Sequence, residues 1–187
     1  QMYEVDQRPV KRPQKRQEPV QLETITPNYP IGELTQEYFF SYTCNLYFEQ
    51  SKNITIEGCY LGTDPAGHAA EKSKDGFNAY DCQNIFIGSE DQQRGNVISG
   101  NSSRGIRLSM CRDVVIQDNK IGVDRTGLIS LPNKNAAIEL WQVTGGAHVS
   151  NNHIVGAISG IHLMDCSDAL IFENIINTDS SFQQDLG

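Results

Sequence analysis

The amino-acid sequence predicts an all-β fold, a right-handed single-stranded parallel β-helix of about five rungs with three short strands in each rung. The chain aligns with itself between residues 46 and 177, each short element alternates apolar with polar residues, and Gly, Asn, Asp or Ser separates the elements. Successive rungs are 31, 29, 33 and 22 residues apart at one apolar anchor. The anchor residues are Ile56, Ile87, Ile116, Val149 and Ile171. A 22-residue coil with insertions in its longer copies explains these intervals.

Three apolar elements recur in each predicted rung. The first elements lie at 46–48, 77–79, 106–108, 138–140 and 161–163, the second at 54–56, 85–87, 114–116, 147–149 and 169–171, and the third at 59–61, 96–98, 119–121, 152–154 and 174–176. One rung cannot bury its apolar side, whereas rungs stacked about 4.8 Å apart form three parallel sheets around a common core. Connections between parallel strands are right-handed in nearly all proteins.

Two columns of small or polar residues are predicted to face inward. One follows the first element and consists of Ser51, Cys82, Cys111, Thr144 and Cys166. The other begins the third element and consists of Cys59, Asn96, Asn119, Asn152 and Asn174. Buried thiols behave as small apolar groups, and inward asparagines satisfy the backbone groups that a tight turn leaves open. We therefore expect internal ladders in place of disulfides or a metal site.

Several short motifs accompany the asparagine column. They are Leu61-Gly-Thr-Asp-Pro-Ala-Gly67, Asn96-Val-Ile-Ser-Gly-Asn101 and Ile121-Gly-Val-Asp-Arg-Thr-Gly127. With these motifs, residues 46–177 resemble the parallel β-helix repeat proteins of the pectate-lyase-like superfamily. The resemblance implies the fold but no single activity, because these repeats are structural and serve many functions.

The two ends of the chain differ from the repeats. Residues 1–19 carry five basic side chains and little apolar surface, so we interpret them as an extended linker or as a docking arm for an acidic surface. Residues 20–45 are more apolar and are expected to cap the first rung. Residues 178–187 form a predicted tail without a convincing cap. We expect a partner, or further sequence, to cover the last rung.

Composition narrows the range of partners. The net charge is −8 and the pI is about 4.9, which disfavours a nucleic-acid partner because such binding needs a basic surface. No apolar run approaches the roughly 20 residues of a membrane span. His148 and His153 belong to different predicted sheets, and His68 lies in a loop. We therefore predict no metal site and no cofactor, and we take the separated histidines as an argument against the copper-maturation relatives of this superfamily.

The outward residues of the first sheet form the candidate binding surface. They are Tyr47, Asn78, Arg107, Glu139 and His162. The resemblance places polysaccharide sites on this face, and these aromatic, amide and charged groups can stack on a glycan and bond to it.

An enzyme would use the same face. A polysaccharide lyase would take Arg107 as its base, with Glu139 and Asp124 as acids or ligands. Against this, the outer residues of a solenoid are usually polar, and an Asp in a G-x-D-x-x-G loop commonly makes an Asx turn. The chain also lacks the clustered acids of the superfamily's calcium-dependent lyases and the paired aspartates of its hydrolases.

The second sheet has an unusually apolar predicted outer column. Phe86, Val115, His148 and Leu170 form it, after Thr55 on the first rung. A continuous apolar stripe suggests that something covers it, either the chain's own N-terminal segment or a loop, or else a protein partner or a second copy of the chain.

The sequence favours a non-catalytic extracellular or surface-assembly scaffold, secreted or at the cell surface, that contacts protein or glycan. The alternatives are a polysaccharide lyase, hydrolase or epimerase acting at the first-sheet groove, and a viral or phage fibre component.

Overall fold

The computed structural model describes residues 44–71, 73–90 and 94–177, with side chains from residue 46 onward. The predicted linker (1–19) and tail (178–187) lie outside these residues. So does the predicted cap (20–45), except for its last two residues, which begin the first strand.

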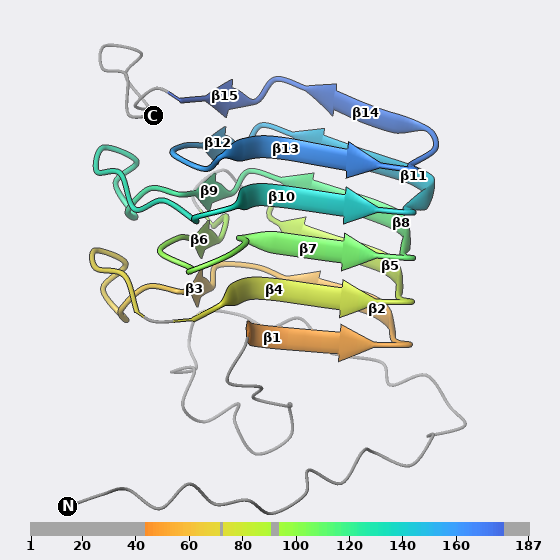
Figure 1. Ribbon diagram of the computed structural model, residues 1–187, viewed down its shortest axis with the longest axis horizontal. Coiled ribbons are helices and arrows are strands. Elements are labelled where there is room, and N and C mark those ends of the chain that lie inside the picture. Colours follow the sequence, from red (N-terminus) through yellow and green to blue (C-terminus); the bar gives the residue numbers. More distant parts are fainter. Residues whose placement is uncertain (1–43, 72, 91–93, 178–187) are drawn as a thin grey trace, which may run out of the picture.

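The described chain is a parallel β-helix of five rungs (Figure 1), which confirms the predicted fold class. The first sheet contains β1 (Cys44–Glu49), β4 (Asp75–Tyr80), β7 (Ile106–Ser109), β10 (Ala136–Trp141) and β13 (Ser159–Met164). The second contains β2 (Lys52–Ile56), β5 (Gln83–Gly88), β8 (Arg112–Gln117), β11 (Thr144–Ser150) and β14 (Ala169–Phe172). The third contains β3 (Tyr60–Leu61), β6 (Val97–Ile98), β9 (Lys120–Ile121), β12 (His153–Ile154) and β15 (Ile175–Ile176).

The predicted register is confirmed residue by residue. In the first sheet the inward residues Leu46, Phe77, Ile106, Ile138 and Ile161 are successive partners. The second sheet aligns Ile56, Ile87, Ile116, Val149 and Ile171 in the same way. Side chains on these columns form one apolar core that is fully buried in the middle rungs. Because side chains in a strand alternate between faces, the residues between them point outward.

The corners between the first and second sheets depend on residues in the left-handed backbone region. One such residue begins each corner: Gln50, Asp81, Met110, Gln142 and Asp165. Four of them directly precede a member of the predicted inward small-residue column: Ser51, Cys82, Cys111 and Cys166. A second left-handed residue follows two positions after most members, at Asn53, Asn84, Asp113 and Asp168. Asn and Asp tolerate this conformation better than most residues, which explains why they recur at these corners.

The same corner geometry corrects one predicted position. Thr144 pairs with Arg112 and is exposed, so it does not belong to the inward column. Val143 follows the left-handed Gln142 and is fully buried at that place. The prediction was wrong because the pairing of β8 with β11 is irregular between Thr144 and Ala147, where Gly145 and Gly146 lie. This stretch holds one residue more than its partner in β8, so the corner residue lies one position earlier than the repeat predicts.

The cysteines in the described chain are packing residues. Cys59, Cys82, Cys111 and Cys166 form no disulfide among themselves, and Cys82 and Cys111 are buried on adjacent rungs. The Cys111 Sγ donates to the Ser109 carbonyl oxygen at 3.4 Å. Burial raises the pKa of the Cys59 thiol to about 11, so this thiol is neutral at physiological pH.

The asparagine ladder is confirmed. The side-chain oxygen of Asn119 accepts the backbone N–H of Asn96 at 3.2 Å and its side-chain N–H at 2.9 Å. Asn119 bonds in turn to the Oδ1 of Asn152, and Asn152 to that of Asn174. Each of these amides also donates to a backbone carbonyl of the preceding rung. The ladder therefore fastens each rung to its neighbours at the entrance to the third sheet.

Candidate functional site

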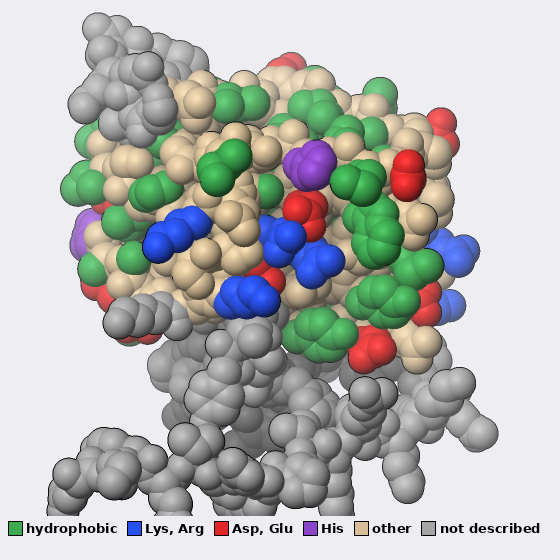
Figure 2. All heavy atoms as spheres, in the orientation of Figure 1, with side chains coloured by type: hydrophobic (Ala, Val, Ile, Leu, Met, Phe, Trp, Pro, Cys, Tyr) green, Lys and Arg blue, Asp and Glu red, His purple; other side chains and the backbone are tan. Residues whose placement is uncertain are grey.

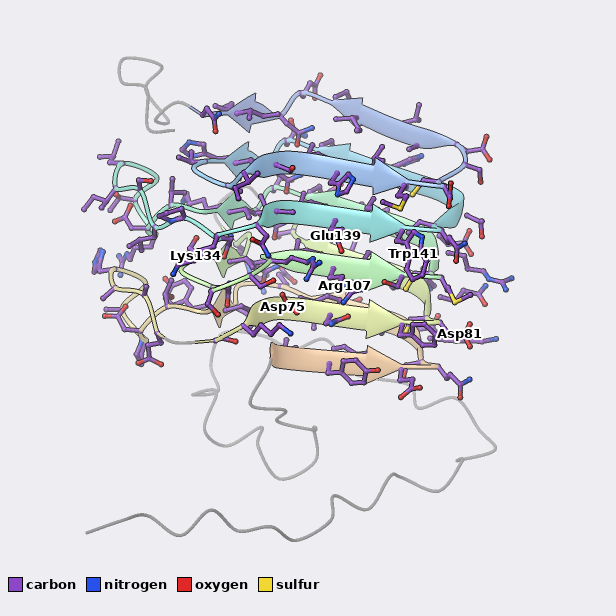
Figure 3. The ribbon with its side chains drawn as sticks, viewed as in Figure 1. Asp75, Asp81, Arg107, Lys134, Glu139 and Trp141 are labelled. Carbon is purple, nitrogen blue, oxygen red and sulfur yellow. The ribbon has the colours of Figure 1, made fainter. Side chains whose placement is uncertain are left out.

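The predicted binding column lies on the outer face of the first sheet. Tyr47, Asn78, Arg107, Glu139 and His162 are successive partners from β1 to β13. Figure 3 shows Arg107 and Glu139 near the middle of this face. The strands hold these side chains at fixed spacing, because each belongs to a rung that is hydrogen-bonded on both sides except at the ends of the stack.

A charged cluster centres on Glu139. Its Oε1 lies 2.8 Å from the Nε of Arg104 and 3.3 Å from the Nε of Arg107. Its Oε2 lies 3.9 Å from the Nδ1 of His162. Neither arginine Nε is aligned for a hydrogen bond, so these contacts are mainly electrostatic. Glu139 is thus surrounded by basic groups from the two neighbouring rungs, those of β7 and β13.

Arg104 extends this cluster toward the start of the strands, and sequence reasoning missed it. Its backbone N–H donates to Asp75 Oδ1 at 3.0 Å, and its Nη1 lies 3.9 Å from the same oxygen. Arg104 precedes β7 rather than occupying the outward position of a strand, so the alternation pattern gave no signal for it. Two arginines, two carboxylates and a histidine therefore meet on this face (Figure 2).

A second outward column lies beside the first, toward the carboxyl ends of the strands. It contains Glu49, Tyr80, Ser109, Trp141 and Met164. Trp141 and Tyr80 are 37% and 38% exposed, and the buried Ser109 separates them in the column. Figure 3 shows Trp141 at the end of its strand, beyond Glu139. This aromatic column was also missed, because the prediction considered only the middle residue of each three-residue element.

Asp124 is not part of this cluster. Its Oδ1 accepts the hydroxyl of Thr126 at 2.7 Å and the backbone N–H groups of Leu128 and Ile129 at 3.2 Å. Its Oδ2 lies 3.2 Å from the Nδ1 of His68. Burial acts to raise the pKa of Asp124, but these hydrogen bonds outweigh it and lower the pKa. The described structure therefore brings Arg107 and Glu139 together and uses Asp124 inside its own loop, as the Asx interpretation expects.

The predicted stripe on the second sheet is a continuous column. Thr55, Phe86, Val115, His148 and Leu170 are successive partners. Phe86 and Val115 are half-buried, whereas His148 and Leu170 are exposed. The apolar surface is thus most open at the last two rungs, and its role as a partner interface stays a prediction.

The four histidines lie in separate parts of the described chain. His162 is on the first sheet, His148 on the second, His153 on the third, and His68 in the loop between β3 and β4. Among residues 44–71, 73–90 and 94–177, no three His, Cys, Asp or Glu side chains are grouped so as to hold a metal ion. The same residues contain no helix long and apolar enough to cross a membrane.

A protein-family model matches most of this chain. The family model described as "Periplasmic copper-binding protein (NosD)" matches residues 23–185. No curated protein and no solved structure matches the chain significantly. The separated histidines argued against the copper-maturation relatives of the superfamily, and this prediction was wrong. The chain matches the NosD family model over residues 23–185 although its histidines lie apart. The donor groups in the described part of the chain do not fit a copper site, so we derive no copper chemistry from them.

Proposed function

This chain belongs to the NosD family of periplasmic proteins, and from that premise we propose that it is a non-catalytic β-helix scaffold outside the cytoplasm whose first sheet binds a glycan. The observation that carries the proposal is the pairing of the two outward columns. The charged cluster around Glu139 lies directly beside the aromatic column of Tyr80 and Trp141.

This combination suits a carbohydrate. The apolar face of a sugar ring packs on an aromatic side chain, and its hydroxyls bond to guanidinium and carboxylate groups at the rim. Tyr80 and Trp141 are two rungs apart, or about 10 Å, since rungs repeat about every 4.8 Å. Two sugars separated by one unit in an extended chain can therefore contact the two rings. Tyr47, Asn78, Arg107, Glu139 and His162 supply polar contacts along the same direction.

The ion pairs favour binding over catalysis. A lyase that used Arg107 as its base would need a neutral guanidine, whereas arginine side chains carry a positive charge in proteins. In this structure the Nε of Arg107 lies 3.3 Å from the Glu139 carboxylate, as in an ion pair. Asp124, the third predicted catalytic residue, has both carboxylate oxygens engaged within its loop and with His68. These contacts support a surface that holds a ligand without transforming it.

Affinity electrophoresis of the full chain through gels containing neutral or acidic polysaccharides tests the proposal. At least one polysaccharide should retard the protein, and Trp141→Ala should weaken retardation about tenfold, because it removes a half-exposed ring from the surface. Ile158→Ala is the matched control, since Ile158 is an exposed apolar residue outside the strands.

Three results would contradict the proposal. The first is that no polysaccharide retards the protein, and the second is that wild type and Trp141→Ala are retarded equally. Either result would show that this face does not bind a glycan. The third is that the wild-type protein releases reducing ends or unsaturated products from a polysaccharide and that Arg107→Ala does not. This result would show that the protein is a polysaccharide-degrading enzyme.

A further inference from the structure

The loops that connect the third sheet to the first differ in length from rung to rung. The first loop (62–74) and the second loop (122–135) are long, whereas the connection between them, residues 99–105, is short. Figure 1 shows the two long loops projecting from the same edge of the solenoid, in yellow and in teal. A recess therefore forms where the short connection lies between two long ones.

The long loops meet across the short connection. The backbone N–H of Arg125 donates to the Gly67 carbonyl at 2.8 Å, and His68 contacts Asp124 at 3.2 Å. Each loop is also closed on itself by its aspartate, Asp64 in the first and Asp124 in the second. The two long loops thus bound the recess on both sides, and these hydrogen bonds hold them together.

A pocket of about 260 Å³ occupies this recess. Its lining consists of Ala70, Glu71, Gly100, Asn101, Ser102, Leu131, Pro132 and Lys134. Most of the lining is aliphatic or backbone. The volume lies below the roughly 300–1,000 Å³ of pockets for drug-sized molecules, so the pocket suits a smaller metabolite.

Opposite charges flank the pocket. Glu71 comes from the first loop and Lys134 from the second, and both are exposed. Neither forms an ion pair with a described residue, in contrast to Arg104 and Arg107 on the neighbouring face. The pocket therefore offers one negative and one positive group without partners inside the described chain.

The floor adds one exposed polar group, the hydroxyl of Ser102. Asn101 is fully buried and donates its side-chain N–H to Leu61 O and Asn133 Oδ1. Its Oδ1 is buried beside Gly62 of the first loop, so it is not exposed to a ligand in the pocket. The Ser102 hydroxyl supplies a further donor and acceptor.

We propose that this pocket binds a free aliphatic α-amino acid, with its carboxylate at Lys134, its ammonium group at Glu71 and its side chain against Leu131 and Pro132. Charge complementarity selects a zwitterion, because a ligand with one charge leaves Glu71 or Lys134 without its counter-ion. The aliphatic wall selects an apolar body over a sugar, whose hydroxyls would lose their hydrogen bonds to water there. This site is separate from the proposed glycan surface, and neither proposal depends on the other.

Isothermal titration calorimetry of the full chain tests the inference with L-alanine, L-valine, L-leucine and L-isoleucine. At least one should bind. Glu71→Gln and Lys134→Gln should each weaken its binding about tenfold or more, as the loss of a charge-assisted hydrogen bond does. Lys52→Gln, an exposed lysine at the start of β2, is the matched control and should bind like wild type.

Single-charge probes complete the design. Butylamine and butyrate carry only one of the two charges and should bind much more weakly than the amino acid. The inference is overturned if none of the four amino acids binds, if both pocket variants bind like wild type, or if butylamine or butyrate binds as tightly as the amino acid. Unchanged circular dichroism of the variants ensures that a loss of binding does not reflect unfolding.

Discussion

Among individual residues, the buried asparagines show how a polar side chain can specify a solenoid. Asn119 is almost fully buried, yet both polar atoms of its amide are bonded. An apolar side chain at this place would leave the Ile87 carbonyl and the Asn96 N–H without these partners. Polar groups buried without hydrogen bonds are costly, which explains why an amide recurs here.

Asn119→Ala should therefore lower the free energy of unfolding by about 3 kcal/mol or more, since several buried groups lose partners at once. Asn78→Ala, on the outer face of the first sheet, should change it by less than about 0.5 kcal/mol. Urea denaturation followed by circular dichroism measures both values. Equal losses in the two variants would show that the ladder does not stabilise the fold.

The asparagine ladder could be predicted from sequence, whereas the aromatic column could not. Asn begins the third element in four of the five rungs, so a repeat alignment alone reveals the ladder. Tyr80, Ser109 and Trp141 share a place too, but their chemistry differs from rung to rung. Arg104 lies outside the strands and joins Glu139 only through folding. A repeat alignment therefore predicts the internal columns, whose residues are alike in successive rungs. It does not reveal the proposed binding surface, whose residues differ from rung to rung.

Among the structural elements, the two long loops combine a predictable and an unpredictable feature. The Asx turns at Asp64 and Asp124 follow from a local motif and depend on residues four or five positions away. The contact between the loops depends on stacking and brings His68 to Asp124 across 56 residues of sequence. The pocket likewise depends on the unequal lengths of three connections, which no single motif encodes.

The second loop should lose its order in acid. The pKa of Asp124 is lower in the folded chain than its ordinary value of about 3.9, so its stabilising effect is complete above that pH. The effect is lost as the pH falls through the lowered pKa, because the protonated carboxyl group accepts hydrogen bonds more weakly. His68 is the titratable side chain in contact with this group.

Hydrogen exchange of the Leu128 and Ile129 amides, corrected for intrinsic rates, measures this effect. Both amides should be protected at pH 6 and lose protection below about pH 3.9. Asp124→Asn should show weaker protection with little dependence on pH over the same range. Full protection of the wild-type amides at pH 2 would contradict the prediction.

In the whole molecule, burial decreases toward the last rung. Ile116 and Val149 are fully buried, whereas Ile171, their partner in the same inward column, is 45% exposed. Ile176 is similarly exposed on the third sheet. β13, β14 and β15 each pair with one neighbouring strand among the described residues, so the last rung presents both an open edge and part of the core.

This gradient predicts different costs for the same substitution along one column. Ile116→Ala should destabilise the chain by about 2–5 kcal/mol, whereas Ile171→Ala should cost about 1 kcal/mol or less because less apolar surface is buried there. Urea denaturation at low protein concentration measures both, and sedimentation velocity checks that the chain is monomeric. Equal costs in a monomer would mean that residues 178–187 cover Ile171. Equal costs that appear only at high concentration, together with a larger sedimentation coefficient, would mean that a second copy of the chain covers Ile171.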